Sequence, residues 1–277
     1  MLLILYLAVL VPFTSYMRNK PYVEKLGYVP RGEVLRYLSA DQKEFVAASL
    51  VMKVLFYFGS LADKSFNKLD IPPDYPAMSR SIHAAVKLDP YNMDAYYFAQ
   101  ATLVWEAKQV QLATDLLEYG MRYRTWDFYL PFYAGFNYAY FLKDYAKAAE
   151  HYKRAGELSG SELSINLAGR YLYESGKSEM AIAYLSAMEK GARDPAIRKT
   201  FQIRILAFKE GRRIELAREE YIRKTGHSPA SVEELQRHGY LTDPPVDPYG
   251  GTFYLEPDGS VRSTSKFAFW RGKQHDL

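Results

Sequence analysis

Apolar positions recur at helical spacing along most of the chain. In residues 144–158, the small Ala148 and Ala155 flank the large Tyr152, and Leu158 follows one turn later. Steps of three and four residues place these side chains on one face of a helix. Small residues on that face let a neighbouring backbone come close, so the segment predicts a second helix packed against it.

The same periodicity predicts a mainly α-helical fold between residues 40 and 225. Pro90 stops one helix, and the proline-rich segment 67–76 is expected to be a loop. The expected helices cover residues 40–62, 75–89, 93–107, 109–122, 126–142, 144–158, 162–175, 178–190, 196–210 and 212–225.

Three of these segments carry an alanine in matching register. Ala113, Ala148 and Ala181 stand 35 and 33 residues apart, which resembles the 34-residue period of tetratricopeptide repeats. The resemblance implies an α-solenoid of antiparallel helix pairs over residues 40–225, with 196–225 as its cap. The positions that it assigns to packing between helices are Ala113, Leu117, Ala148, Tyr152, Ala155, Ala181 and Leu185.

The pattern changes after the last expected helix. Residues 230–238 predict a short helix that Ser231 caps, with Glu234 at the spacing of a capping box. A β-hairpin is expected further on, with strands at 252–255 and 261–264. In its turn, Pro257 and Gly259 supply the preset φ and the positive φ that such a connection needs.

The order of motifs in residues 226–265 resembles the C-terminal region of type II secretion major pseudopilins. The resemblance implies a small α+β module, followed by a tail at 266–277, and residence in the cell envelope. The calcium loop of that family has no match here, so neither calcium binding nor filament assembly is carried over. The residues that carry the resemblance are Asp247, Pro248, Tyr249, Gly250, Gly251, Asp258 and Gly259.

Residues 1–17 are apolar and contain no charged side chain. They predict an uncleaved N-terminal membrane anchor, although the run is short against the roughly 20 residues of a comfortable span; a cleaved signal sequence and a buried helix remain alternatives. Residues 18–39 are expected to form a linker. Basic residues after the apolar run favour a cytoplasmic body, whereas the pseudopilin resemblance favours a periplasmic one. We expect a single-pass inner-membrane anchor with a periplasmic body.

Aromatic residues crowd the segment 126–145, in a chain with 25 tyrosines. These rings either pack between successive helices or line the concave groove that the repeat resemblance implies. Basic residues nearby (Lys143, Lys147, Arg170 and Arg204) form either a lip for an acidic tail or ordinary solvated charge. The residues predicted to line the groove are Tyr96, Tyr129, Tyr133, Asn137, Tyr140, Asn166 and Arg170.

Composition removes several kinds of chemistry. A net charge of +4 without a block of Lys or Arg argues against nucleic acid binding, and the absence of Cys removes disulfides and thiolate catalysis. The five histidines are too far apart for a metal-ligand pair, and no phosphate-binding or nucleophile motif occurs. Asp243, Asp247 and Asp258 form either a calcium loop or turns. We expect no metal and no cofactor.

The sequence therefore predicts a non-catalytic scaffold at the inner membrane that binds a peptide or helix of a protein partner, within a pilus or secretion-type assembly. The alternative is a structural, pseudopilin-like subunit of such a machine, although residues 2–10 lack the Glu that pilins carry near the start of their apolar run. An enzyme is supported only by the acidic loop 243–258.

Overall fold

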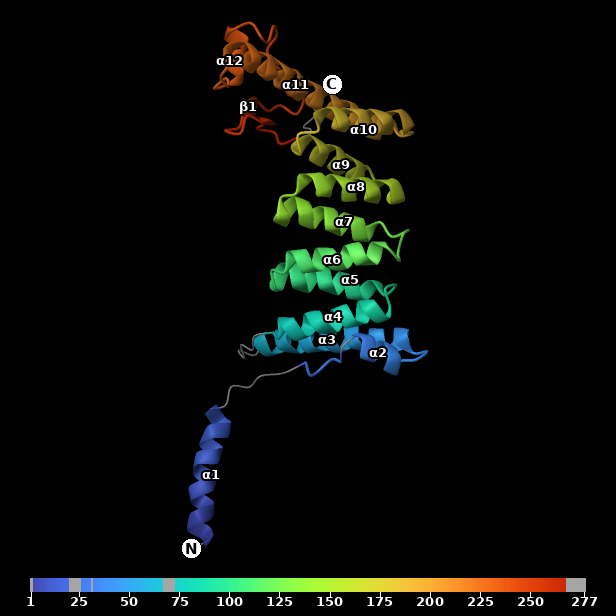
Figure 1. The fold of residues 1–277 in the computed structure, drawn as a ribbon, viewed down its shortest axis with the longest axis vertical. Helices are drawn as coiled ribbons and strands as arrows, with labels where there is room; N and C mark the ends of the chain where they lie inside the picture. The colour runs from blue at the N-terminus through green and yellow to red at the C-terminus, as the bar shows by residue number, and fades with distance from the viewer. Residues whose placement is uncertain (1, 20–25, 31, 67–72, 268–277) are drawn as a thin grey trace, which may run out of the picture. The chain divides into compact units, whose positions relative to one another are not determined.

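The computed structural model describes residues 2–19, 26–30, 32–66 and 73–267 of the 277-residue chain. Within these residues the protein is mainly helical and has one antiparallel sheet of two short strands (Figure 1). The chain divides into two compact units, Met1–Gln109 and Val110–Leu277, which we describe separately. The residues predicted to form a helical array, 40–225, fall in both units.

The N-terminal unit contains five α-helices and one π-helix in its described residues. They are α1 (Leu2–Asn19), α2 (Gly32–Leu38), α3 (Lys43–Phe66), α4 (Tyr75–Leu88), α5 (Met93–Ala99) and η1 (Gln100–Glu106). The predicted linker 18–39 is thus partly helical, since α2 forms within it and packs against α4. Helix α4 begins at Tyr75, as predicted, because Asp74 in the proline-rich segment caps it by accepting a hydrogen bond from the Ala77 amide at 3.0 Å.

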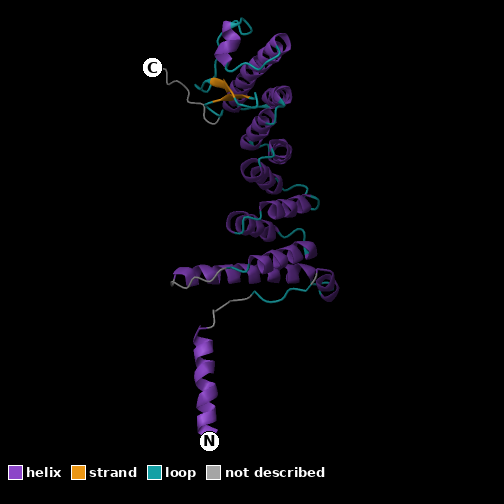
Figure 2. Ribbon diagram, turned by 60° about the vertical axis from the view of Figure 1, so that its left-hand side comes forward, coloured by secondary structure: helices purple, strands orange, loops and turns teal. Residues whose placement is uncertain are grey.

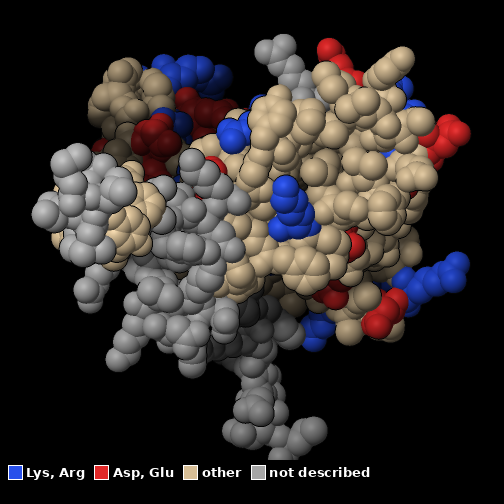
Figure 3. Space-filling view, turned by 90° about the horizontal axis from the view of Figure 1, so that it is seen from below, with Lys and Arg blue, Asp and Glu red and all other residues tan. Residues whose placement is uncertain are grey.

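The core of this unit lies between α3 and α4. Val51 and Val54 on α3, and Met78 and Ile82 on α4, are almost completely buried. Figure 3 looks onto α2 and α3 from below and shows a surface of mostly uncharged side chains, with one basic side chain in its middle. Helix α3 therefore buries one face in the unit and presents a second face that carries little charge.

The C-terminal unit stacks its helices in the order of the chain. Each helix from α6 to α11 packs against the next one, as Figure 1 shows. The elements are α6 (Val110–Met121), α7 (Tyr129–Phe136), the π-helix η2 (Asn137–Leu142), α8 (Tyr145–Ser159), α9 (Glu162–Glu174), α10 (Ser178–Gly191), α11 (Pro195–Thr225), α12 (Val232–Arg237), β1 (Phe253–Leu255) and β2 (Val261–Ser263).

Small residues set the spacing between these helices. Ala148 and Ala155 of α8 are fully buried, and Tyr152 between them is 2% exposed. On α9, Gly169 faces the Leu185 side chain of α10 so closely that a β-carbon at position 169 would lie 2.8 Å from it. Adjacent backbones thus approach more closely than larger side chains would allow.

Helix α11 differs from the prediction. Residues 196–210 and 212–225 were expected to be two helices, but the structure has one helix of 31 residues. Gly211, the expected break, is a helical residue directly beneath the Tyr173 ring of α9, where any β-carbon would collide with the tyrosine hydroxyl. The glycine therefore permits close packing and makes no turn. Its low helix propensity, about 1 kcal/mol, is offset by the packing of the helix around it.

The short helix and the hairpin after α11 agree with the prediction. The Ser231 hydroxyl accepts a hydrogen bond from the Glu234 amide at 3.3 Å, and the Glu234 carboxylate accepts one from the Ala230 amide at 2.6 Å. Strands β1 and β2 pair in antiparallel register with Leu255 opposite Val261. Gly259 in the turn has a φ of 82°, which favours glycine.

This C-terminal segment shares a core with the helices before it. Val232 of α12 and Phe253 and Val261 of the hairpin belong to the same buried cluster as Tyr173 of α9 and Phe208 of α11. The Tyr173 hydroxyl also donates a hydrogen bond to the Val261 carbonyl at 3.3 Å. Figure 2 shows the strands beside the last helices of the unit. The segment is therefore packed as a continuation of the helical stack.

Candidate functional site

An aromatic row runs along one face of α7 and η2. It consists of Tyr129, Tyr133, Phe136 and Tyr140, spaced by four, three and four residues. The Tyr129 and Tyr133 rings stack with centroids 6.3 Å apart, and the Phe136 and Tyr140 rings stack at 5.5 Å. Tyr129 is 42% exposed and Tyr140 57% exposed. The row combines groove residues predicted from the sequence with Phe136, which the prediction omitted.

Three other residues predicted to line the groove lie inside the protein, and their assignment is corrected. Tyr96 is fully buried and donates a hydrogen bond to the Pro90 carbonyl at 2.9 Å. Asn137 is also fully buried, because it faces α6, where its amide donates to the Thr114 hydroxyl at 3.1 Å. Asn166 is 8% exposed. None of these three side chains is available to clamp the backbone of a bound peptide.

Arg204, predicted as one possible part of a basic lip, also has an internal role. Its guanidinium donates to the Asn166 carbonyl at 3.0 Å, to the Phe267 carbonyl at 2.6 Å and to the Tyr249 hydroxyl at 3.1 Å. It thereby links three segments: helix α9 through Asn166, the loop before the hairpin through Tyr249, and the chain after the hairpin through Phe267. Lys147 lies with its ammonium 4.9 Å from the Tyr138 ring centroid and does not line the pocket described next.

The aromatic row ends in an open pocket of about 470 Å³. Tyr140 forms part of its wall, together with residues at the ends of η2 and α9 and residues of the hairpin. It is lined by Ala139, Tyr140, Lys143, Tyr145, Arg170, Tyr171, Glu174, Tyr254, Glu256, Arg262, Ser263, Lys266 and Phe267. The pocket joins two predicted features, the groove residues Tyr140 and Arg170 and the C-terminal module.

Positive charge predominates in this pocket. Its four cations are Lys143, Arg170, Arg262 and Lys266, against the carboxylates Glu174 and Glu256. Arg262 forms an ion pair with Glu174, and Glu256 accepts a hydrogen bond from the Tyr254 hydroxyl at 3.2 Å. Within the part of the chain that the structure describes, no carboxylate lies within 4.0 Å of the charged nitrogens of Lys143, Arg170 or Lys266.

Two of these cations lie over aromatic rings. The Lys143 ammonium is 5.3 Å from the Tyr140 ring centroid, and the Arg170 guanidinium is 5.7 Å from that of Tyr171. Lys143 has a left-handed φ of 57° at the end of η2, which turns the chain there. Arg170 is half-buried, and its Nε has no hydrogen-bond partner among the described residues. Both charges are positioned by the fold and remain available to an anionic group.

Two tyrosines of the pocket have raised pKa values. Burial raises the pKa of Tyr171, which the neighbouring Arg170 partly offsets, and burial together with Glu256 raises the pKa of Tyr254. Their hydroxyls therefore stay protonated. The cations and aromatic rings of the pocket suit a carboxylate next to an apolar group.

The residues that carried the pseudopilin resemblance hold turns. One Asp247 oxygen accepts from the Tyr249 amide at 2.8 Å, and the other accepts from the hydroxyls of Ser263 and Ser265. Asp258 accepts from the Ser260 amide at 2.8 Å, a bond that lowers the pKa of its carboxyl. The structure thus uses Asp247 and Asp258 as turn-forming side chains. The described residues contain no cluster of His, Asp and Glu suited to a metal ion.

Pro248, Gly250 and Gly251 complete this loop. Gly250 has a φ of 81°, and Gly251 lies so close to the Asp247 carboxylate and the Ser265 amide that a side chain would displace them. The loop residues therefore hold the chain ahead of the hairpin and contribute no group to the pocket.

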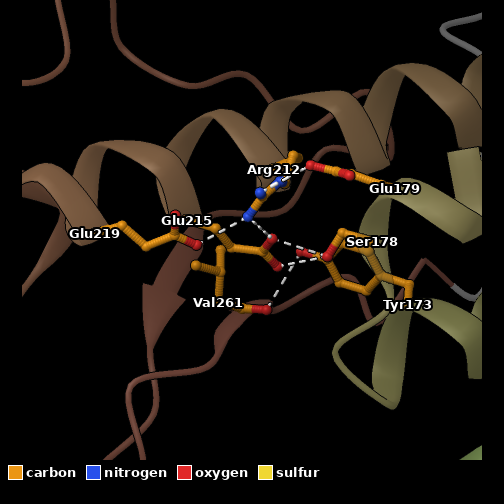
Figure 4. A network of polar contacts seen from close by, with 7 residues as sticks. All are labelled: Tyr173, Ser178, Glu179, Arg212, Glu215, Glu219 and Val261. Atoms are coloured by element: carbon orange, nitrogen blue, oxygen red, sulfur yellow. Dashed lines mark hydrogen bonds and ion pairs between the residues drawn. The ribbon is translucent and has the colours of Figure 1, made fainter.

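A separate polar cluster joins α10 to α11 (Figure 4). Arg212 forms ion pairs with Glu179 at 2.9 Å, Glu215 at 3.3 Å and Glu219 at 2.9 Å. The Ser178 hydroxyl donates to Glu215 at 2.7 Å. Each carboxylate in the cluster has a cation or hydroxyl partner, so the arrangement stabilises the helix pair and offers no vacant charge.

The sequence interpretation missed Tyr254, Arg262 and Lys266 as site residues. They meet Arg170 because the hairpin packs against α9, where Arg262 donates a hydrogen bond to the carbonyl of Glu174, 88 residues earlier in the chain. Alternation along β2 does predict that Arg262 points away from the buried Val261 and Ser263. No local signal indicates which surface it then faces.

Comparison with known proteins does not assign the chain to a family. A scan of the chain against protein-family models gives no match. A search of curated protein sequences likewise finds no significant relative.

Proposed function

We propose that this protein is a non-catalytic scaffold, attached to a membrane, whose pocket captures an acidic segment of a partner protein. The observation that carries the proposal is the aromatic row that ends at three cations, Lys143, Arg170 and Lys266, which have no carboxylate partner among the described residues. In this reading the cations bind a carboxylate of the partner. The aromatic row binds the apolar residues that follow it.

The chemistry of the pocket favours a peptide over a small substrate. Its openness at the end of a row of aromatic rings allows an extended chain to continue along α7. Rings with few rotatable bonds are effective anchors, since little conformational entropy is lost on binding. The described pocket residues include no nucleophile beside a base, which supports binding over catalysis.

The arrangement of helices supports a tetratricopeptide-like solenoid. From α6 to α11, each helix packs on its neighbour in the chain, and small residues lie at the close contacts. Solenoids of this type present elongated binding surfaces. The hairpin shares its core with the last helices, which favours a cap for the array over an independent filament subunit.

Membrane attachment is proposed through α1. Among its described side chains, Tyr6, Val9, Val11 and Phe13 are 58–65% exposed, and exposed apolar groups in such a run are stabilised by lipid. We place the anchor in the inner membrane and the body in the periplasm, as the pseudopilin resemblance implies. A secretion or pilus component is then the expected partner.

Binding of labelled peptides tests the pocket. Fluorescein-labelled peptides with two aspartates next to a phenylalanine, and their asparagine counterparts, would be titrated into the protein by fluorescence anisotropy. Arg170→Gln and Lys143→Gln are each expected to weaken binding of the aspartate peptide at least tenfold, since each removes a charge-assisted contact. Lys209→Gln removes an exposed cation outside the pocket and is expected to change nothing.

Equal affinity for aspartate and asparagine peptides, or equal weakening by Lys209→Gln, would contradict an acidic ligand. Circular dichroism of each variant confirms that loss of binding is not loss of folding.

A further inference from the structure

Between positions 45 and 61, the outward face of α3 carries mostly apolar side chains. Phe45, Met52 and Phe56 are 69%, 46% and 69% exposed, and they lie on one stripe of the helix with Ser49. Lys53 is the only charged residue between positions 45 and 61. A helix face exposed to water normally carries more charge than this.

The composition of α3 alone would allow it to cross a membrane. Over Lys43–Leu61, its length and its mean hydropathy of 1.5 are sufficient. Its inner face, however, is committed to the N-terminal unit, because Val54 and its neighbours are buried against α4. The Tyr57 hydroxyl also accepts a hydrogen bond from the Asp74 amide at 2.9 Å. Spanning would separate α3 from this core.

Helix α2 adds a second apolar patch in the same unit. Val34, Tyr37 and Leu38 are 48%, 88% and 69% exposed, and α2 packs against α4, as α3 does. We call these three residues, together with Phe45, Met52 and Phe56, the α2–α3 face. Figure 3 shows the predominance of uncharged side chains on this side of the molecule.

We propose that the α2–α3 face rests on the surface of a lipid bilayer, with α3 parallel to the membrane. Aromatic and aliphatic side chains with a lone lysine suit the boundary between headgroups and acyl chains, because a lysine there extends its ammonium towards water. Such a helix inserts about 5–10 Å into the interface. The helix thus touches the bilayer with one face and keeps the other in the protein core.

The position of the face in the chain points to lipid as its occupant. Only residues 20–31 separate the apolar helix α1 from α2. A segment of that length spans at most about 40 Å even when fully extended. Once α1 lies in a bilayer, the α2–α3 face is held near the same surface. This step rests on the proposed attachment through α1 and is independent of the peptide pocket.

Site-specific labelling of the full chain tests this placement. The sequence contains no cysteine, so Ser49→Cys and the control Leu216→Cys, at a 50% exposed position on α11, each introduce one attachment point for an environment-sensitive nitrobenzoxadiazole fluorophore. The labelled proteins would be reconstituted in vesicles of phosphatidylethanolamine and phosphatidylglycerol. We expect doxyl-labelled lipids to quench the label at position 49 at least twofold and to leave the label at position 216 unchanged.

Each other result overturns the inference. Iodide quenching of the label at position 49, without quenching by doxyl lipid, would place the face in water. Protection from both quenchers that depends on protein concentration would indicate a second copy of the chain, and protection that persists in detergent would indicate cover by α1. Failure of the full chain to bind vesicles would refute attachment through α1 and this inference together, while peptide binding would remain a separate measurement.

A double variant gives a second readout. Phe45→Gln with Phe56→Gln leaves α1 and the buried face of α3 intact. The protein should therefore remain folded and vesicle-bound, while the label at position 49 loses its doxyl quenching. Unchanged quenching in this variant would show that these two rings do not hold the face on lipid.

Discussion

Helices α3 and α11 are both long and both bury one face, yet their outward faces differ. The outward face of α3 has Phe45, Met52 and Phe56 with a single lysine between positions 45 and 61. Helix α11 instead carries dense charge in exposed ion pairs, such as those of Glu220 with Arg223 at 3.9 Å and with Lys224 at 2.8 Å. The buried faces of both helices pack in the protein core. The charge on the outward face of α11 suits water, whereas the apolar outward face of α3 suits lipid in our proposal.

The largest effect is expected on the buried face of α11. Gly211→Val would force a side chain into the Tyr173 ring, and overpacking of this kind lowers the free energy of unfolding by about 3 kcal/mol. Urea unfolding followed by circular dichroism measures the loss. Gly191→Ala is the control, because a β-carbon there meets nothing within 4 Å; an equal loss in both variants would mean that the Tyr173 contact is not the cause.

The next-largest effect is a difference in the free energy of unfolding between substitutions on the two faces of α3. Val54→Ala removes buried methyl groups and is expected to lower the free energy of unfolding by about 2 kcal/mol. Met52→Ala on the outward face is expected to change it by less than about 0.5 kcal/mol in the absence of lipid. Similar losses would show that the outward face packs against protein, which would remove the contrast with α11.

On the charged side of the comparison, Arg212→Gln leaves Glu179, Glu215 and Glu219 without their shared cation. We expect a loss of about 1 kcal/mol that shrinks with added salt, because the carboxylates are only partly buried. Lys224→Gln breaks one exposed pair and should lower stability less, because solvent screens that pair. Thermal unfolding at low and high salt distinguishes the two.

The smallest effect concerns His151 of α8, a titratable residue within the helix stack. Burial lowers its pKa below 6.5, while Glu118 and Glu150 partly oppose this and Lys147 adds to it. The unfolded chain therefore binds a proton that the folded protein excludes, so stability should fall as the pH drops from 6.5 towards the folded pKa. His151→Gln should flatten this acid-side decline; because the variant also loses the ring stacking on Tyr138 and the contact with Glu118, the slope with pH is the quantity to compare. A steeper decline of stability with falling pH in the variant would contradict a lowered pKa of His151 in the folded protein.

Helix positions were largely predictable because the signals are local. Caps such as Asp74 and Asp144 accept hydrogen bonds from the amides three residues on, and Gly160 ends α8 with a φ of 64°. The error at Gly211 has a physical origin. A glycine at a turn and a glycine beneath a neighbouring ring look the same in a sequence, and only the position of Tyr173 distinguishes them.

The candidate site was only partly predictable. Tyr140 and Arg170 follow from their place in the helical pattern, but Asn137 does not reach the groove because Thr114 of α6 binds it inside. The contribution of Arg262 depends on its ion pair with Glu174, a contact between an edge of the hairpin and the end of α9. Contacts between such distant parts of a chain are set by packing, which a local pattern does not encode.

The π-helix η2 suggests where this chain can tolerate the insertion or deletion of a residue. A π turn holds one more residue than an α turn. The interval from Ala113 to Ala148, which is 35 residues long, contains η2 and the longer loop before α7; the interval from Ala148 to Ala181, which is 33 residues long, contains no π-helix. A wider turn of this kind can absorb an inserted residue while the helices on either side keep their packing faces. We expect deletion of one residue within η2 to be tolerated where the same deletion in α9 is not.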